Sequence, residues 1–391
     1  MFKEDVLGNS DVIILSKIEW NWQRQSVHRL TFWISQYARK LIFIENFPKR
    51  LPRFYELNRV LMRILYHGRP RAIKYQDSLI QKNNIFIITP FSFPPVNFIF
   101  NLLNRRFFFP VLIRRIKKDY NLNQTIIFCF LPTQASLDFI ELFKPKLLIY
   151  YCVSNFIADP LSPKDIVQTE FRVLKEADMV VCDSDFLYQS KREIRDDIVQ
   201  VLPAVDFALF NQSDNGMVTG PIKRVCYFGG INNIRIDFQI IDSIASDNIE
   251  VRLIGPIRDC IPELPKNVKI FGMVEYKNLP HYLKDCDCLI LPYKVNEFTK
   301  GVIPAKLFEC FATGKPVIAT ALPDLLLYRD VINIASTPKE FINIIKNINL
   351  YETKDKYEKR IKIAKEHSED RQFNRLWEVM RFKALKKECD N

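Results

Sequence analysis

The sequence lacks an apolar run long enough to span a membrane, which takes roughly 18 residues or more. The longest approach to one, VNFIFNLLNRRFFFPVLI at 96–113, is interrupted by Arg105 and Arg106. The first residues, MFKEDVLGNSDVIIL, also lack the basic segment and long apolar segment of a secretory signal. We therefore expect a cytoplasmic protein, with peripheral attachment to the inner face of the plasma membrane left open.

Metal-binding patterns are missing as well. The nine cysteines are odd in number and include no C-x-x-C pair, and Cys286 and Cys288 lie in DCDCLILPY, which has the pattern of a helix end entering a buried strand. The four histidines are far apart, without ligand spacing. These features predict a reduced intracellular chain with no metal site.

Glycine is scarce, and its positions are informative. Six of the 10 glycines lie within residues 229–314, and four of these follow expected strands in YFGG, LIGP and IFGM. Glycine is used where the backbone turns tightly or approaches a neighbour closely. Several glycine-ended strands followed by helix N-termini predict an edge of the sheet that binds phosphate.

What the sequence does have is basic charge in its first third. The net charge is +12, and residues 1–118 hold 21 Lys and Arg against 7 Asp and Glu. Aromatic residues accompany this charge in FSFPPVNFIFNLLNRRFFFPVLIRRIKK (91–118). Apolar segments flanked by cations suit an anionic membrane surface, here through Arg105, Arg106, Arg114 and Arg115. The alternative is a core helix and strand with a basic outer face. Nucleic acid is disfavoured because no zinc, RNP-like or helix-turn-helix pattern is present.

Short apolar runs alternate with amphipathic stretches along the chain. Strands are expected at 11–16, 40–46, 84–90, 125–132, 146–153, 179–184, 223–230, 249–256, 268–273, 288–293, 315–320 and 331–335. Helices are expected between them, at 27–39, 134–143, 237–246, 278–285, 305–312 and 338–348 among others. This alternation predicts an α/β fold with two doubly wound parallel-sheet domains facing a cleft. We expect the domains at 1–210 and 211–353, and a helical tail at 354–391 that packs back on the first domain and carries Trp377, Met380 and Phe382 on an apolar side.

Lys306 and Glu309 stand out in GVIPAKLFECFATGKPVIAT (301–320), one helical turn apart at the start of an apolar helix. A solvated helix face would explain them, and so would a ligand held at the helix N-terminus. Arg235 has two interpretations as well, a phosphate ligand or the partner of Asp237 or Asp242.

One long segment of the second half resembles a known protein family. The segment NVKIFGMVEYKNLPHYLKDCDCLILPYKVNEFTKGVIPAKLFECFATGKPVIATALPD (267–324) resembles the donor domain of GT-B glycosyltransferases. It is most similar to the retaining group 1 enzymes (family 4-like) that build bacterial surface polysaccharides, including teichuronic-acid-type enzymes. CYFGGINNIRIDFQIIDSIA, LLIYYCVSNF and VVCDSDFLYQSKREI extend the similarity over most of the chain.

The resemblance implies roles for residues of the second half. Glu309 would bind the ribose hydroxyls of a nucleotide sugar, while Lys306 and Arg235 would neutralise the departing diphosphate and so act catalytically. Gly301 stands where the family has the first Glu of its E-x7-E motif, and Gly230 stands in place of an arginine. The helix is expected to begin near Pro304 and to add its dipole. The full expected donor-binding set is Gly229, Gly230, Arg235, Val274, Tyr293, Thr299, Lys300, Lys306 and Glu309.

The acceptor side departs further from the family. The first strand is followed by ILSKIEWNW without a glycine-rich loop, and Ser154 lies where the family group often has acidic residues. We expect Glu19, Trp20 and Ser154 to line the acceptor side. His28 has the pattern of a structural residue.

The resemblance implies a metal-independent glycosyltransferase. It would move a sugar from a nucleotide-diphosphate sugar to a lipid-linked or polysaccharide acceptor, with no cofactor beyond that co-substrate. One alternative is an inactive GT-B chain that serves as a partner in a polysaccharide assembly complex. A GT-B sugar-nucleotide epimerase is a weaker one, because the acid and base groups it needs are not evident.

Overall fold

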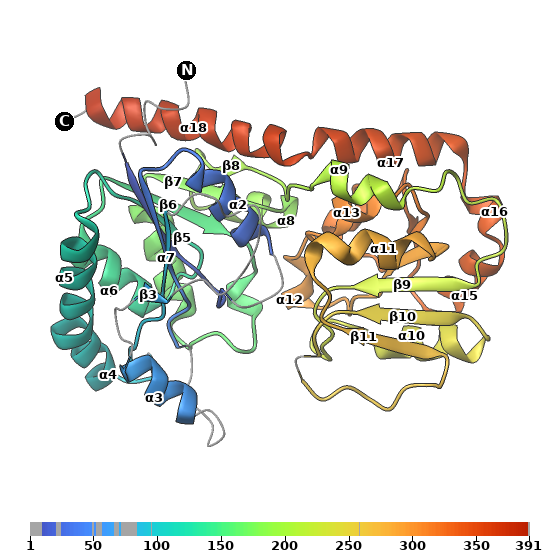
Figure 1. Ribbon diagram of the computed structural model, residues 1–391, viewed down its shortest axis with the longest axis horizontal. Helices are drawn as coiled ribbons and strands as arrows, with labels where there is room; N and C mark the ends of the chain where they lie inside the picture. Colours follow the sequence, from blue (N-terminus) through green and yellow to red (C-terminus); the bar gives the residue numbers. More distant parts are fainter. Residues whose placement is uncertain are drawn as a thin grey trace. The chain divides into compact units, whose positions relative to one another are not determined.

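The computed structural model describes residues 10–20, 25–48, 51, 57–65, 70–71, 84–94, 96–257 and 259–389. The chain divides into two compact units (Figure 1). The first unit comprises Met1–Val201 and Phe373–Asn391, and the second comprises Leu202–Gln372. The sequence analysis placed this join at 210/211. It also treated 354–391 as one tail, whereas residues up to Gln372 pack with the second unit.

The first unit contains an eight-stranded sheet in the order β3-β4-β2-β1-β5-β6-β7-β8, in which only the short β3 runs antiparallel to its neighbour. Its strands are almost wholly apolar, as in DVIIL and LLIYYC, which is typical of parallel strands buried on both faces. The strands are β1 Asp11–Leu15, β2 Lys40–Ile44, β3 Pro70–Arg71, β4 Ile85–Ile88, β5 Ile126–Cys129, β6 Leu147–Cys152, β7 Met179–Cys182 and β8 Val199–Gln200.

One face of this sheet is covered by α5, α6 and α7, which contribute Phe109, Phe139 and Val173 to the same core as the strands. The helices of the first unit are α2 Ser26–Ser35, α3 Leu57–Leu65, α4 Phe98–Leu103, the π-helix η2 Asn104–Phe108, α5 Phe109–Tyr120, α6 Gln134–Phe143, η3 Phe156–Ala158, α7 Ile166–Glu176 and α8 Asp185–Arg192.

The second unit contains a six-stranded parallel sheet in the order β11-β10-β9-β12-β13-β14. The strands are β9 Arg224–Phe228, β10 Glu250–Ile254, β11 Val268–Gly272, β12 Cys288–Leu291, β13 Val317–Ala319 and β14 Asn333–Ile334. Its helices are α9 Phe207–Phe210, η4 Asn211–Ser213, α10 Phe238–Ser246, η5 Tyr276–Asn278, α11 Leu279–Lys284, α12 Glu297–Lys300, α13 Leu307–Ala312, α14 Pro323–Leu326, α15 Pro338–Lys346, α16 Ile348–Tyr351 and α17 Lys354–Glu366.

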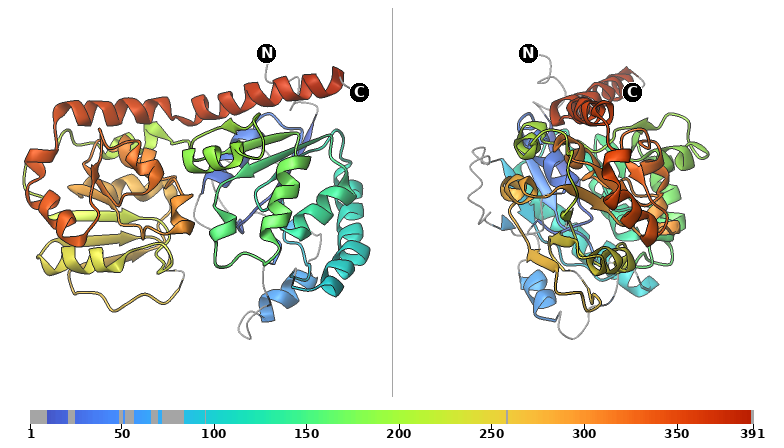
Figure 2. Two further views of the ribbon diagram at one scale, coloured as in Figure 1. Left: turned by 180° about the vertical axis from the view of Figure 1, so that it is seen from behind. Right: turned by 90° about the vertical axis from the view of Figure 1, so that its right-hand side faces the viewer.

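The C-terminal stretch is helical as expected and consists of two helices. α17 ends at Glu366, and α18 spans Glu369–Cys389 (Figure 2). Between them Val205 donates its N–H to the His367 carbonyl (2.9 Å) and pairs with Ser368, so the backbone leaves the helical pattern there. Trp377 and Met380 are buried as expected, whereas Phe382 is exposed.

The two parallel-sheet α/β units confirm the predicted fold class. Each expected strand contains an observed one, and of the strands in the described residues only the two-residue β3 and β8 were missed.

Candidate functional site

The strand order of the second sheet defines where a ligand would bind. Successive strands run outward in one direction from β9 to β11 and in the other direction from β12 to β14, so the order reverses between β9 and β12. In doubly wound sheets, ligands bind beyond the carboxyl ends of the strands at such a reversal. Gly229 follows β9 and Tyr293 follows β12, so both lie at this point.

The backbone conformation and close packing at the ends of β9 and β10 require glycine. Gly229 has a φ of +128° and Gly255 a φ of +146°, a region that residues with a side chain rarely adopt. The N–H of Gly229 donates to the Ile254 carbonyl (2.8 Å), and a Cβ on Gly255 would lie only 1.9 Å from the Gly229 carbonyl oxygen. The two strand ends therefore approach each other through backbone alone.

Lys306 lies just before α13, and its side chain lies against Gly229. A Cβ built on Gly229 would lie 2.1 Å from Lys306 Nζ, so the ammonium occupies the space that a side chain would fill. The same Nζ lies 3.9 Å from the centroid of the Tyr227 ring, 5.7 Å from Phe228 and 5.8 Å from Tyr293. Aromatic faces attract a cation at such distances. Among the residues that the structure describes, no carboxylate pairs with this ammonium.

The expected helix start near Pro304 is wrong. α13 begins at Leu307, with Lys306 as its N-cap, because residues 304–306 form a turn in which Leu307 donates its N–H to the Pro304 carbonyl (2.8 Å). With only six residues, α13 supplies a weaker dipole than we expected. Positive charge at this edge comes mainly from side chains.

Arg235 is the second cation near the reversal. Its guanidinium lies over the Phe298 ring, 5.2 Å from the centroid. Burial raises the pKa of Tyr293, and the nearby charge of Arg235 acts in the opposite direction. Within the described part of the chain Arg235 forms no ion pair, so the alternative pairing with Asp237 or Asp242 is not observed. Lys306 and Arg235 thus both lie close to Tyr293.

Glu309 is buried on α13, with 7% of its surface exposed. Its Oε1 accepts a hydrogen bond from the Tyr276 hydroxyl (2.9 Å), which orients the carboxylate. Tyr276 belongs to the short η5 helix that follows β11. The sequence analysis missed Tyr276 and also Tyr227, which lies beneath the Lys306 ammonium. The sequence did hold a signal for both: Tyr227 lies near the end of β9, and Tyr276 lies shortly after β11, at the edge where the site was expected.

The remaining residues of the expected donor set lie around this edge. Val274 follows β11 and is buried, and the Gly230 carbonyl accepts from the Tyr227 hydroxyl (3.1 Å). Thr299 is buried, and its hydroxyl accepts from the Asn296 N–H (3.0 Å) in the capping box of α12 and donates to the Lys294 carbonyl, so it supports the loop. Lys300 forms an exposed ion pair with Glu297 (2.6 Å). Gly301 ends α12 with a φ of −83°, which any residue can adopt.

The residues expected on the acceptor side belong to the first unit, beyond the ends of β1 and β6. Glu19 pairs with Arg63 (2.8 Å), and Trp20 is buried against His28 and Phe43. Ser154 is buried, and its hydroxyl lies 3.3 Å from Lys17 Nζ. Lys17 was missed by the sequence analysis, although it lies directly beyond β1.

The described residues also bear on the membrane and metal expectations. No described helix is long and apolar enough to cross a membrane. No group of three or more His, Cys, Asp or Glu among the described residues could hold a metal ion. The four arginines expected to contact an anionic membrane surface are exposed on η2 and α5: Arg105, Arg106, Arg114 and Arg115.

Comparison with known structures fits this architecture. Anabaena HepE, solved in complex with UDP and glucose, has 12% identity and a TM-score of 0.65 over 95% of this chain and 99% of that one. A glycosyltransferase from Rickettsia africae ESF-5 has 14% identity and a TM-score of 0.63 over 96% and 98%, and TarM has 10% and 0.61 over 95% and 98%. The chain has the GT-B fold.

Sequence comparison places the resemblance in the second GT-B unit. Residues 223–348 match the family model described as Glycosyl transferases group 1, which confirms the resemblance there. TuaH of Bacillus subtilis (strain 168), whose name assigns it as a glycosyltransferase of teichuronic acid biosynthesis, is 29% identical over 203 residues. That match covers 45% of this chain, and the chain spans about half (51%) of the relative's length.

Proposed function

We propose that this protein transfers a sugar from a nucleoside-diphosphate sugar to an acceptor in the synthesis of a cell-surface polysaccharide. One observation carries the proposal: the Lys306 ammonium fills the space beside Gly229, at the reversal of the second sheet and one turn from Glu309. HepE is described in complex with UDP-glucose, and TuaH by its name acts in teichuronic acid biosynthesis, which supports this donor and this product class.

The donor would lie with its diphosphate against two cations. Lys306 and Arg235 would neutralise the charge that grows on the phosphate as the bond from the anomeric carbon to the phosphate oxygen breaks. Glu309, oriented by Tyr276, would accept hydrogen bonds from the two ribose hydroxyls. We propose that no metal is used, since the two cations serve the leaving group themselves.

We propose that transfer retains the configuration of the sugar. The acceptor hydroxyl would attack the anomeric carbon on the face that the phosphate leaves, and the departing phosphate oxygen would take the proton of that hydroxyl. This route needs no protein base, which suits a first unit where Ser154 and Lys17 lie beyond β6 and β1 and where Glu19, the carboxylate expected on this side, is paired with Arg63 (2.8 Å). A lipid-linked or polysaccharide acceptor and a peripheral location on the membrane surface belong to the same proposal.

The donor claim is tested by calorimetry with UDP, GDP, ADP and CDP. One of these should bind, and Glu309→Gln should weaken binding about tenfold to a hundredfold, because hydrogen bonds to a charged group contribute about 1.5–3 kcal/mol. Lys306→Met should weaken the diphosphate more than the monophosphate. Lys346→Met is the control, since Lys346 is exposed on α15 and paired with Asp247 (2.8 Å), outside the expected donor set. Absence of binding by every diphosphate would refute the proposal.

A second function is favoured by Gly301. Its position corresponds to a carboxylate of the family motif, and its ordinary φ of −83° shows that the backbone does not demand glycine there. The chain would then be a GT-B partner that binds nucleotide without turning it over. Product formation from a nucleotide sugar in extracts containing the native acceptor separates the two functions, and Gly301→Glu is the variant to compare.

A further inference from the structure

Two helices of the first unit present apolar side chains to solvent. On α4, Phe98, Ile99 and Leu102 are 77%, 63% and 49% exposed, and no residue of this helix is buried. On α3, Leu61, Ile64 and Leu65 are 53%, 49% and 57% exposed. We call these six residues the apolar edge. Since isolated exposed apolar residues are ordinary but six on two short helices are not, the edge calls for a partner.

Cations lie beside the apolar edge on η2 and α5. Arg106, Arg114 and Lys118 are exposed and form no ion pair with any residue that the structure describes. Arg114 and Lys118 are four residues apart on α5 and therefore share a face, which is opposite to the buried Leu112 and Ile116. We call Arg106, Arg114 and Lys118 the cationic stripe.

Arg105 differs from these three, although the sequence analysis grouped it with Arg106, Arg114 and Arg115. Its Nη1 lies 2.5 Å from Glu141 Oε2 and 3.2 Å from Asp138 Oδ1, so its charge is already balanced by α6. This contact raises the pKa of Arg105, the hydrogen bond to Glu141 being the largest cause. Lys117 likewise points to α6, where it donates to the Phe143 carbonyl (3.1 Å).

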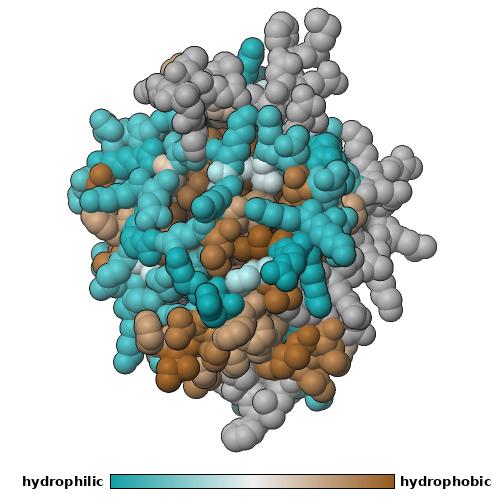
Figure 3. Space-filling view, turned by 90° about the vertical axis from the view of Figure 1, so that its left-hand side faces the viewer, coloured by the Kyte–Doolittle hydropathy of each residue, from teal (hydrophilic) through white to brown (hydrophobic). Residues whose placement is uncertain are grey.

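The apolar edge occupies one end of the first unit. α3 and α4 lie at the lower end of this unit in Figure 1, and apolar residues gather along the same lower edge in the space-filling view of Figure 3. Hydrophilic residues predominate on the surface above them in that view, with apolar atoms showing between them. Apolar side chains at a tip with cations above them match the two layers of a bilayer surface, acyl chains and then phosphates.

We propose that the apolar edge and the cationic stripe together bind an anionic phospholipid bilayer. The apolar side chains enter the headgroup boundary while Arg106, Arg114 and Lys118 contact lipid phosphates. The charge of the stripe favours a bilayer over a second copy of the chain, because two cationic stripes would repel each other. The inference sharpens the peripheral location proposed above by naming its residues, and it does not depend on sugar transfer.

The test is flotation of the full chain with vesicles of phosphatidylcholine alone or with about one third phosphatidylglycerol, without nucleotide or acceptor. The chain should bind the anionic vesicles and be released by high salt. Arg106→Gln, Arg114→Gln and Lys118→Gln together should lower partitioning about a hundredfold, or about fivefold for each charge. The matched control changes the exposed Lys266, Lys339 and Lys362 to Gln, which removes the same charge from the second unit.

The apolar edge is tested separately. Phe98→Ser, Ile99→Ser and Leu102→Ser together should reduce binding to anionic vesicles at least tenfold, whereas Phe382→Ser, Leu327→Ser and Leu350→Ser, at equally exposed positions, should not. Circular dichroism and thermal unfolding of each variant, without nucleotide, confirm that the first unit is folded. The proposal is overturned if wild type ignores anionic vesicles, or if either triple variant binds like its control. It is also overturned if the apolar triple variant abolishes a dimer while vesicle binding persists.

Discussion

Gly229 joins two features of the candidate site, a left-handed backbone and a lysine packed where a side chain would be. Gly229→Ala would place a methyl 2.1 Å from Lys306 Nζ and 3.5 Å from the Tyr227 hydroxyl. Because the ammonium ends a flexible side chain, it would swing away, and the residue would also bear about 1–2 kcal/mol of backbone strain. We expect a folded variant with nucleotide affinity reduced about tenfold or more.

Two other glycines serve as controls for Gly229→Ala. Gly216 has a φ of +84° with open space around its Cβ position, so Gly216→Ala has the strain without the displaced cation. Gly220 has open space and no positive φ, so Gly220→Ala has neither. Calorimetry and urea unfolding of all three variants separate strain from site geometry. If Gly216→Ala weakened nucleotide binding as much, displacement of Lys306 would not be the cause.

Single residues also show what sequence reasoning could and could not reach. The spacing of Lys306 and Glu309 and the glycines after expected strands predicted the candidate site, because both follow from local pattern, and the binding roles of these residues stay predictions. Tyr276 was missed because its contact with Glu309 joins residues 33 positions apart on separate elements. The phosphate role expected of Thr299 stays a prediction, although its hydroxyl already has partners in a capping box that the loop sequence did not reveal.

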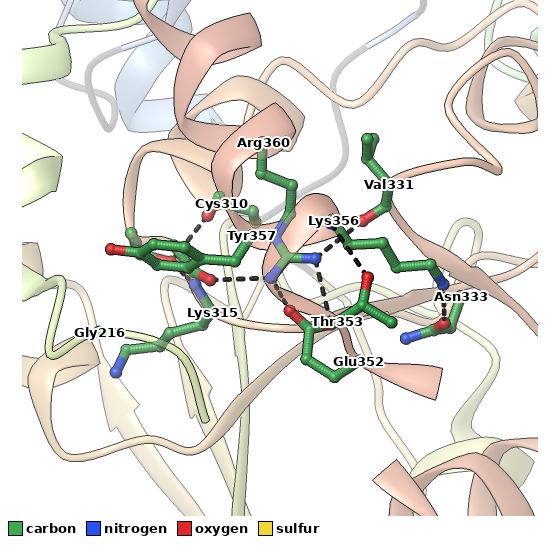
Figure 4. A network of polar contacts seen from close by, with 12 residues as sticks. Gly216, Cys310, Lys315, Val331, Asn333, Glu352, Thr353, Lys356, Tyr357 and Arg360 are labelled. Atoms are coloured by element: carbon green, nitrogen blue, oxygen red, sulfur yellow. Dashed lines mark hydrogen bonds and ion pairs between the residues drawn. The ribbon is translucent and has the colours of Figure 1, made fainter. Parts of the chain in front are cut away.

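At the scale of elements, α17 is fixed to its neighbours by a buried ion pair. Arg360 and Glu352 are both buried, and Figure 4 shows the Arg360 guanidinium between Glu352 and the Val331 carbonyl, to which it donates (2.9 Å). It also donates to the Gly314 carbonyl (2.9 Å), at the end of the segment that carries Lys306 and Glu309. α17 therefore supports the loop after α13.

Arg360→Met should destabilise the second unit by about 3–5 kcal/mol, because it leaves Glu352 charged and buried without a partner. The double variant with Glu352→Gln should lose less, since no charge is then left unpaired. Lys354→Met is the matched control on the same helix. Its partner Glu358 lies 3.6 Å away and both side chains are exposed, so a change of under about 1 kcal/mol is expected. Urea unfolding measures all three, and equal losses for Arg360→Met and Lys354→Met would contradict this account.

For the whole molecule, the sequence predicted the fold class more accurately than the boundary between the two units. Twelve apolar runs separated by helix-length segments sufficed for two parallel sheets, because strands buried on both faces are apolar throughout. The join was harder to place. The segment 211–223, rich in polar and small residues, has the composition of a linker, yet Ser213 is buried and Asn211 donates to the Ala312 carbonyl (3.0 Å) within the second unit. Such contacts are long-range and leave no local pattern.

The two units have separate apolar cores, and this separation predicts their response to ligand. The core of the second unit draws its residues from 205–364 and that of the first from 13–198. All the expected donor residues belong to the second unit. We therefore expect two thermal transitions, of which a nucleoside diphosphate at a hundred times its Kd raises one. The stabilisation at that concentration is about 2.7 kcal/mol, or about 5–10 °C for a unit of this size.

Differential scanning calorimetry of the full chain measures this shift, and Lys306→Met should remove most of it at the same nucleotide concentration. Arg360→Met identifies which transition belongs to the second unit, since it should lower that one alone. A shift of the other transition, or an equal shift of both, would mean that nucleotide binding involves the first unit directly. The donor site could then not be the edge formed by Gly229, Arg235, Lys306 and Glu309 alone.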